Sequence, residues 1–235
     1  MDKKYCIAVV GCGRIAANAH FPAFKALGNV RVKYACDIIE RKAEKKSEYD
    51  FVENAITDYK IALADPEVEA VYVLTPNYAH YVVAMDALKA GKHVFCEKPI
   101  TVNYKLSVEM AEEAKRRGKL LNIGVCNRYN KSVELLEEMN RKGKFGKIYH
   151  VCCSFRNYRC IPGLGGDFTT KAQSGGGPLI DLGVHFIDLA MHFMGSPKPV
   201  AVSGCTYCKF ADSTISDSVH SQFGEKVAGG TFDVE

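Results

Sequence analysis

The chain has 235 residues, of which 47% are hydrophobic and 25% charged. This balance is that of a globular protein, and it excludes a disordered, a collagen-like or a coiled-coil chain. The net charge is only +4, and the basic runs are interleaved with Glu and Gly, so they indicate solvated helix faces rather than a nucleic-acid-binding surface. No apolar run reaches the ~18 residues of a membrane span, and the first residues hold no apolar signal region. We therefore expect a soluble, cytoplasmic protein with neither a nucleic acid nor a membrane as partner.

The first half of the chain alternates strand-like and helical patterns. Apolar strand-like runs are predicted at 7–10, 30–37, 70–74, 93–96 and 120–126. Helices are predicted up to Leu27 and at 40–49, 78–90 and 103–117. Continuous apolar strands separated by helices indicate a parallel sheet that is covered on both faces. The predicted fold is an α/β Rossmann domain, a doubly wound parallel sheet, over residues 1–126.

The pattern changes after residue 126. Helices are predicted at 134–141 and up to Met194, separated by a glycine-rich loop at 157–177. Strand-like runs are predicted at 147–155, 200–210, 218–223 and 227–234. This order predicts an α+β domain over 127–235, for substrate binding and oligomerisation, with an open, mainly antiparallel sheet. Because no closing element follows the last run, we expect that sheet to be truncated.

The chain contains ten cysteines, but it is neither short nor loop-rich, as a disulfide framework would require. Five of them lie in or at the ends of apolar runs, where a thiol acts as a small hydrophobe: Cys6, Cys12, Cys36, Cys96 and Cys126. Cys205 and Cys208 have the CxxC spacing of a metal-ligand pair, but no second pair follows them. We expect reduced cysteines with a structural role, and no metal.

A dinucleotide fingerprint of the form GxGxxA directly follows the first strand: Gly11-Cys12-Gly13-Arg14-Ile15-Ala16. The first glycine permits the tight turn, the second lets the backbone approach a pyrophosphate, and the alanine lets the helix pack on the sheet. The pyrophosphate would lie on the amides of that helix's N-terminus.

Asp37 ends the second strand, where an acidic residue binds ribose hydroxyls and repels a 2′-phosphate. The spacing therefore favours NAD over NADP. The alternative is a chance glycine-rich turn followed by a helix-capping Asp.

Two further strand ends carry polar residues at the edge where such sheets bind ligands. The segment Thr75-Pro76-Asn77-Tyr78-Ala79-His80 follows the third strand, and it also suits a helix start with Thr75 or Asn77 as N-cap. Glu97-Lys98-Pro99 follows the next strand, which would project Lys98 over the nicotinamide. The alternative is a surface lysine in a loop.

Asp181 and His185 are four residues apart on a predicted helix, so they share one face, and Asp188 and His192 continue that stripe. A histidine that titrates near neutral pH suits proton exchange with an alcohol, and a carboxylate can orient it or hold a substrate hydroxyl. A solvated helix face and a metal pair are the alternatives, and a metal pair would need further ligands.

These motifs, in this order, resemble the glucose-fructose oxidoreductase, inositol dehydrogenase and rhizopine-catabolism (Gfo/Idh/MocA) family. The resemblance implies a Rossmann domain that binds NAD or NADP, and an open-faced sheet that often forms the dimer interface. It implies that Lys98 is the catalytic lysine, and that Asp181 and His185 bind substrate and exchange its proton. It also implies that Thr75, Asn77, His80 and Glu97 line the cofactor. Family members usually run well past 300 residues, so this chain departs from them in length.

The hypothesis that follows is NAD(P)-dependent interconversion of a secondary alcohol and a ketone on a sugar, sugar derivative or cyclic polyol, with NAD favoured over NADP. Asn127, Arg128 and Tyr158 are candidates for the substrate wall. A homo-oligomer is expected through the C-terminal sheet where that sheet is complete. One rival is a cofactor-binding sensor on the same fold, which could dispense with Lys98 and His185, so their presence favours an enzyme. The others are NAD-dependent glycoside cleavage and an incomplete, inactive fold.

Overall fold

The structure is a computed structural model that describes residues 3–156, 162–207, 209 and 227–234. The chain forms two compact units, Met1–Gly124 and Val125–Glu235, and each is described by itself. Within the described ranges, no helix has the length and apolar character needed to cross a membrane.

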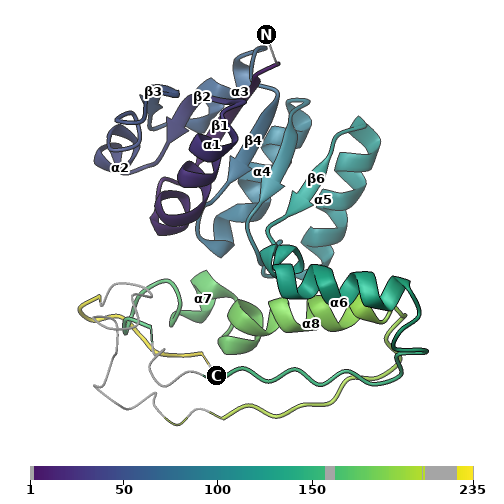
Figure 1. Cartoon of the computed structure of the whole chain (residues 1–235). Coiled ribbons are helices and arrows are strands. Elements are labelled where there is room, and N and C mark those ends of the chain that lie inside the picture. Colours follow the sequence, from purple (N-terminus) through teal and green to yellow (C-terminus); the bar gives the residue numbers. More distant parts are fainter. Residues whose placement is uncertain (1–2, 157–161, 208, 210–226, 235) are drawn as a thin grey trace. The chain divides into compact units, whose positions relative to one another are not determined.

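A six-stranded parallel sheet forms the centre of the first unit (Figure 1). Its strands are β1 (Tyr5–Val10), β2 (Val30–Cys36), β3 (Val52–Ile56), β4 (Ala70–Val73), β5 (His93–Cys96) and β6 (Leu121–Ile123). Their spatial order is β3-β2-β1-β4-β5-β6, so the chain changes direction across the sheet between β1 and β4. At that point Val10 pairs with Cys36 of β2 and with Val73 of β4. This is the strand order of a Rossmann fold, as the sequence predicts.

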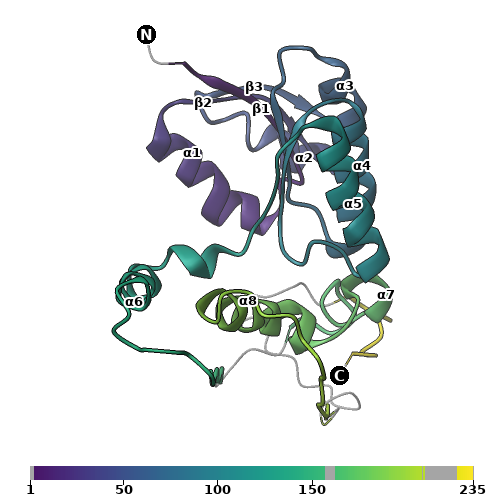
Figure 2. The same cartoon turned by 90° about the vertical axis from the view of Figure 1, so that its right-hand side faces the viewer.

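Helices cover both faces of this sheet (Figure 2). They are α1 (Phe21–Leu27), α2 (Glu40–Glu44), α3 (Tyr59–Ala64), α4 (His80–Lys89) and α5 (Tyr104–Arg117). Side chains alternate along β1, so Ala8 and Val10 pack in the core cluster that holds α3, α4 and α5. Ile7 and Val9 pack in the other cluster, with Phe21 and Phe24 of α1. The near-continuous apolar strand is explained by burial on both faces.

The helix boundaries follow the capping signals of the sequence. The Asn103 side chain accepts a hydrogen bond from the Lys105 N–H and begins α5, and Gly118 ends it in the left-handed conformation. Gly28 ends α1 in the same way, with φ +67°. Glycine adopts this conformation without a Cβ clash, which is why it marks both ends.

Two elements of the first unit escape the sequence analysis, namely β3 and α3. The strand β3 reads Val-Glu-Asn-Ala-Ile, and its three central residues are exposed, as expected for an edge strand. Such a strand lacks the apolar run by which the others are predicted. Helix α3 has only six residues, and the Asp58 side chain caps it. Helix α2 ends five residues earlier than predicted.

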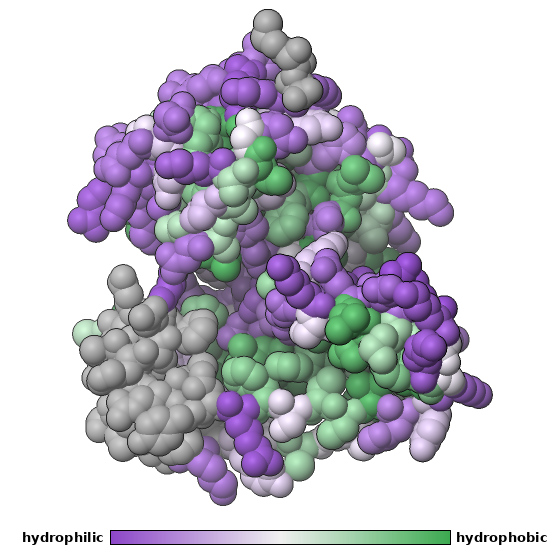
Figure 3. Space-filling view, viewed as in Figure 1, coloured by the Kyte–Doolittle hydropathy of each residue, from purple (hydrophilic) through white to green (hydrophobic). Residues whose placement is uncertain are grey.

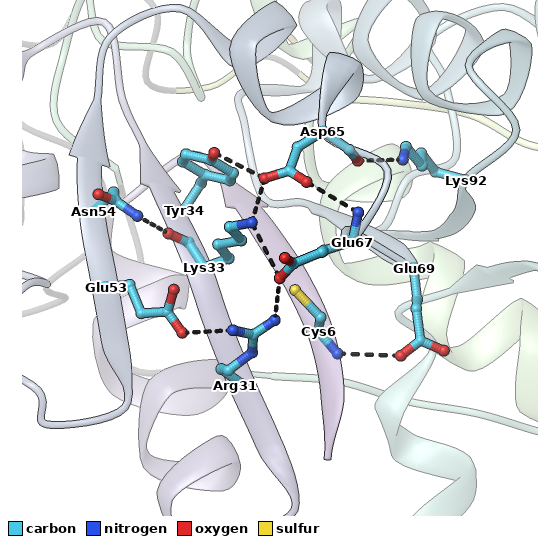
Figure 4. A network of polar contacts seen from close by, with 10 residues as sticks. All are labelled: Cys6, Arg31, Lys33, Tyr34, Glu53, Asn54, Asp65, Glu67, Glu69 and Lys92. Atoms are coloured by element: carbon cyan, nitrogen blue, oxygen red, sulfur yellow. Dashed lines mark hydrogen bonds and ion pairs between the residues drawn. The ribbon is translucent and has the colours of Figure 1, made fainter. Parts of the chain in front are cut away.

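An ion-pair network lies at the amino ends of the strands, at the edge away from the glycine turn (Figure 4). Lys33 in the middle of β2 contacts Asp65 (2.6 Å) and Glu67 (3.1 Å), and Arg31 near its start contacts Glu53 (3.0 Å) and Glu67. The hydrogen bond from Lys33 lowers the pKa of Asp65 to about 2. These charges therefore stabilise strand connections and do not contribute to a ligand site at the other edge.

The second unit contains the helices α6 (Lys131–Arg141), α7 (Lys171–Ser174) and α8 (Val184–Phe193). A π-helical turn, Leu179–Gly183, leads directly into α8, and a 3₁₀ turn, Cys126–Tyr129, precedes α6. The Asn140 amide donates to the Phe193 carbonyl (3.2 Å), and the carboxylate of Asp188 accepts two hydrogen bonds from Arg128 (2.7 and 2.5 Å). Polar contacts thus join α8 to α6 and to the preceding turn.

The described parts of the predicted strands at 147–155, 200–210 and 227–234 have no ladder partners. An isolated pair of strands is only marginally stable in water. This is a physical reason why the backbone of these segments is irregular. Residues 227–234 instead contact the glycine-rich loop: the Val227 N–H donates to the Leu164 carbonyl (2.9 Å), and the Asp233 N–H to that of Thr169 (3.1 Å). The predicted strand 218–223 and Cys208 lie outside the described residues.

Hydrophobic side chains gather on the surface of the second unit (Figure 3). They line an apolar groove of about 460 Å³ between residues 151–155 and the helical stretch 178–190. Leu179 and Ile187, which are 63% and 55% exposed, stand on this groove. The outer face of α8 is therefore apolar, which is unlike the solvated helix face considered from the sequence.

Candidate functional site

The turn after β1 has the geometry that a pyrophosphate requires. Gly11 has φ +97°, and a Cβ placed on it would lie 2.5 Å from the Leu74 carbonyl oxygen. Gly13 has no atom within 4 Å of the position of a Cβ, so open space lies in front of its backbone. Ala16 is fully buried in the first turn of the following helix. Gly11 therefore makes the turn possible and Gly13 keeps its outer side clear, while Arg14 and Ile15 are exposed on the same turn.

Asp37 lies directly after β2, beside this turn. Its Oδ2 accepts a hydrogen bond from the Cys12 N–H, and its Oδ1 accepts one from the Ile39 N–H, both at 2.9 Å. These two bonds fix the plane of the carboxylate between the glycine turn and the start of α2. Each carboxylate oxygen retains a lone pair, so the group can still accept hydrogen bonds from the two hydroxyls of a ribose.

His80 joins the loops that follow β4 and β5. Its Nε2 lies 2.8 Å from the Thr75 carbonyl oxygen and its Nδ1 lies 2.7 Å from that of Pro99, across a cis Lys98–Pro99 bond. The ring is fully buried, and this burial lowers the pKa of His80. The structure thus shows His80 as a clamp between two strand-end loops, and its predicted contact with a cofactor remains a prediction.

The Thr75 hydroxyl is buried and has no hydrogen-bond partner within the described part of the chain. Burying a hydroxyl without a hydrogen-bond partner costs free energy. Because this hydroxyl lies at the end of β4, a bound ligand could provide the missing partner. Pro76 is exposed and Asn77 half-buried beside it, in a 3₁₀ turn that begins at Asn77. The predicted ligand edge and the predicted helix start therefore coincide.

Glu97 and His20 form a largely buried pair that the sequence analysis misses. The His20 Nε2 lies 2.8 Å from the Glu97 Oε1, and the two side chains are only 12% and 14% exposed. The other oxygen of Glu97 accepts the Lys98 N–H at 3.1 Å. A Cβ on Gly124 would lie 2.9 Å from this carboxylate, so only glycine leaves room for it. The pair holds the backbone at Lys98, whose side chain is half-buried.

A periodicity argument could have found His20. In the α-helix that the sequence predicts here, His20 would share a face with Ala16, four residues before it, whereas the structure forms a π-helical turn over Ala16–His20. Its ring is surrounded by the aromatic rings of Phe24, Tyr72 and Phe95, at centroid distances of 6.1, 6.0 and 5.2 Å. A histidine on an otherwise apolar face, beside the dinucleotide motif, is the signal.

In the second unit, Asp181 and His185 lie in one continuous helical stretch, and both are half-buried. Asp181 belongs to the π-helical turn, so the simple four-residue spacing of an α-helix does not apply to it. Asp188 contacts Arg128, and the Nε2 of His192 lies 3.6 Å from the Glu137 Oε2 on α6. The second half of the predicted stripe therefore supports helix packing.

The structure places the three candidates for the substrate wall differently. The guanidinium of Arg128 is bound by Asp188. Asn127 lies half-buried in the 3₁₀ turn before α6, and Tyr158 lies outside the described residues. The predicted substrate contacts of all three remain predictions.

The residues of the first unit fit a nicotinamide dinucleotide. The open space at Gly13 suits the pyrophosphate, and the fixed carboxylate of Asp37 suits a ribose. The buried Thr75 hydroxyl could form a hydrogen bond with the cofactor. All three lie after the carboxyl ends of β1, β2 and β4, around the point where the strand order reverses, which is where such sheets bind dinucleotides.

Comparisons with known proteins agree with this geometry. Residues 6–125 match the model of an oxidoreductase family with an NAD-binding Rossmann fold, and residues 133–226 match the GFO/IDH/MocA C-terminal domain. The chain is 31% identical over 220 residues to D-glucoside 3-dehydrogenase of Escherichia coli, covering 93% of this chain and 61% of that protein. It is 34% identical over 125 residues to inositol 2-dehydrogenase/D-chiro-inositol 3-dehydrogenase of Lactiplantibacillus plantarum, covering 52% of this chain and 36% of that protein.

Among solved structures, GenD2 from gentamicin A biosynthesis, in complex with NAD, has a TM-score of 0.72 and 27% identity, covering 84% of this chain and 55% of that one. The chain thus spans roughly half the length of the relatives it matches. The two family matches cover most of the sequence, and the strand order and the glycine turn agree with the first of them. The chain therefore belongs to the GFO/IDH/MocA oxidoreductase family, and its first unit is that family's NAD-binding Rossmann domain.

Proposed function

We propose that the chain carries the active-site residues of an NAD-dependent dehydrogenase that interconverts a secondary alcohol and a ketone on a sugar, sugar derivative or cyclic polyol. The observation that supports this most directly is the loop after β5. Lys98 lies at the ligand edge of the sheet, and its backbone is held from two sides, by Glu97 with His20 and by the His80 clamp on Pro99. A structural lysine on a surface loop needs no such support. Relatives that bear dehydrogenase names for glucosides and inositols favour the substrate class.

The proposed roles follow from the chemistry of the side chains. When NAD is bound, its nicotinamide supplies an acceptor for the hydride. The Lys98 ammonium would stabilise the alkoxide that develops as the alcohol loses its proton. His185 would take that proton, and Asp181 would hold a neighbouring hydroxyl and so orient the reacting carbon. Asp37 would bind the adenosine ribose, and Thr75, Asn77 and Glu97 would line the remaining part of the cofactor site.

The test is the Lys98→Ala variant, with Lys105→Ala on the exposed side of α5 as a matched control. NADH binding is measured by the fluorescence of the reduced cofactor, and turnover is measured by its absorbance with a panel of sugars and inositols. We expect Lys98→Ala to lower kcat by about 100-fold or more while NADH binding changes by less than about threefold. Turnover within about threefold of wild type would contradict the role of Lys98.

The same assay separates the rival activities. Glycoside cleavage with transient oxidation would release a leaving group without net formation of NADH, whereas a sensor would bind NADH without turning over any member of the panel. If the unmodified chain did not bind NADH, the proposal would be contradicted, because cofactor binding is the first requirement of the reaction.

A further inference from the structure

The last described segment of the chain, residues 227–234, crosses the glycine-rich loop of the second unit, and we call it the strap. The Val227 N–H donates to the Leu164 carbonyl at 2.9 Å. At the crossing, a Cβ on Gly230 would lie 2.2 Å from the Gly165 Cα, and a Cβ on Gly165 would lie 2.4 Å from the Gly230 Cα. The two backbones are therefore in direct contact, and neither glycine can carry a side chain unless they move apart.

Two side chains join this crossing to the start of α7. Thr169 is fully buried, and its hydroxyl accepts a hydrogen bond from the Gly165 N–H at 2.8 Å. The Asp233 Oδ1 accepts a hydrogen bond from the N–H of Lys171, the first residue of α7, at 2.6 Å. The residue that precedes α7 makes no capping bond with its own side chain, so Asp233 of the strap does the work of an N-cap. Figure 2 shows the strap, in yellow, beside α7.

Helix α7 in turn holds the backbone that leads to Asp181. Ser174, at the last position of α7, is 4% exposed, and its hydroxyl donates to the Gly176 carbonyl at 2.8 Å. The Gly177 carbonyl then accepts a hydrogen bond from the Asp181 N–H at 3.3 Å, inside the π-helical turn. A continuous series of contacts therefore runs from Asp233 on the strap to the backbone of Asp181.

We propose that the strap positions the turn that carries Asp181, and that Asp233 is a positioning residue which acts on Asp181 through α7. The proposal rests on the function proposed above, in which Asp181 holds a substrate hydroxyl. A carboxylate in that role must be held within about 0.5 Å of its productive position, which requires supporting contacts behind it. A π-helical turn is rare and often marks a functional site, and here the strap and α7 supply its support.

The first measurement is backbone hydrogen–deuterium exchange of the whole chain, read in peptides that cover 171–183. Asp233→Ala removes the cap, and loss of a cap corresponds to about fivefold faster exchange through local opening. Asp233→Asn keeps an oxygen acceptor, so its exchange should stay within about twofold of the unmodified chain. Asp167→Ala, an exposed carboxylate of the same loop, is the matched control and should leave these peptides unchanged. Peptides from β1 and β4 serve as the internal reference.

A pair of glycine variants tests the crossing independently of the cap. Gly230→Ala should speed exchange in 171–183 by about tenfold or more, because its methyl group would overlap the Gly165 backbone. Gly204→Ala makes the same change where a Cβ meets no atom within 4 Å, and it should have no effect on these peptides. If Gly230→Ala does not fold, the comparison of Asp233→Ala with Asp233→Asn decides.

The second measurement is reduction of NAD with a methyl glucoside and with myo-inositol, followed by absorbance below the melting temperature of each variant. We expect Asp233→Ala to lower kcat/KM for the alcohol by about fivefold while the dissociation constant of NADH changes by less than about twofold. Asp233→Asn should restore kcat/KM. A strap that served stability alone would lower the melting temperature without changing kcat/KM below it.

The outcomes separate the strap from the proposed function. Unchanged exchange at 171–183 in both Asp233→Ala and Gly230→Ala would overturn the strap, whether or not the chain turns over a substrate. Faster exchange with unchanged kcat/KM would overturn the positioning role and leave the proposed function standing. If the unmodified chain oxidised no sugar or inositol of the panel, the proposed function would be refuted, and the positioning role with it.

Discussion

Replacing Gly13 by alanine should weaken cofactor binding without harming the fold. A Cβ at this position meets no atom within 4 Å, and the backbone lies outside the positive-φ range that strains other residues. Gly→Ala at such a position stabilises a protein by about 0.4–1 kcal/mol, because the unfolded chain loses conformational freedom. The new methyl group would, however, occupy the space that the pyrophosphate needs.

The loss of NADH affinity can be estimated from the hydrogen bond that the methyl group would remove. A methyl group in front of the turn would remove at least one hydrogen bond from a backbone N–H to a charged phosphate oxygen, worth about 1.5–3 kcal/mol. This corresponds to about a 10- to 150-fold weaker affinity for NADH. The fluorescence titration measures this affinity, and urea unfolding of the same preparation measures the stability.

Gly11→Ala is the contrasting variant. Its Cβ would lie 2.5 Å from the Leu74 carbonyl oxygen and 2.8 Å from the Thr75 nitrogen, both backbone atoms, and its φ is +97°. We expect about 1–2 kcal/mol for the conformation and about 1–3 kcal/mol for the overpacking, so this variant should unfold at clearly lower urea concentration. The reasoning would be refuted if Gly13→Ala bound NADH as the unmodified chain does, or if the two variants were equally stable.

Three further predictions concern polar contacts around the candidate site and in the second unit. Gly124→Ala should displace the Glu97 carboxylate, 2.9 Å from the new Cβ, and lower the unfolding free energy by about 0.5–1.5 kcal/mol, because the contacts of that carboxylate with His20 and the Lys98 N–H weaken; an unchanged urea midpoint would contradict this. Burial lowers the pKa of His80, so its ring takes up a proton more readily in the unfolded chain than in the folded one. The free energy of unfolding should therefore fall as the pH drops below about 6.5. His80→Gln, which can still donate to a carbonyl, should reduce that slope in unfolding curves measured between neutral and acidic pH, and an identical slope would refute the assignment. Arg128→Gln and Asp188→Asn should show a coupling energy of about 1 kcal/mol in a double-mutant cycle, whereas zero coupling would mean that the contact contributes nothing to stability.

The first unit was predictable because its sequence signals agree with one another. Apolar strands, glycine helix ends and the GxGxxA turn all indicate one fold, and the bounds of β5 at His93–Cys96 were predicted to the residue. The edge strand β3 was not predicted, because an exposed strand lacks an apolar run. The His20–Glu97 pair also cannot be predicted from the periodicity of single elements, because the two residues are 77 positions apart. They meet only when the helical turn before α1 packs against β5.

The second unit was less predictable for a related reason. The apolar runs at 147–155 and 200–210 have strand-like patterns, but a pattern does not provide a ladder partner. The pairing of Arg128 with Asp188, and of His192 with Glu137, depends on how α8 lies against its neighbours. From sequence alone, Asp188 and His192 looked like continuations of the Asp181–His185 stripe, and Arg128 looked like part of a substrate wall.

The central position of β1 has a consequence for how the protein is made. This strand leaves the ribosome before all the others, yet one of its two neighbours, β4, pairs with it through Val10 and Val73. At about 5–20 residues per second, synthesis of the roughly 60 residues between them takes about 3–12 s. During that time one side of an apolar strand has no partner, which is the kind of edge that captures other chains. Nascent chains in which β4 has not yet left the ribosome should therefore depend on chaperones, and that dependence should fall once Val73 has emerged and β1 acquires its second neighbour.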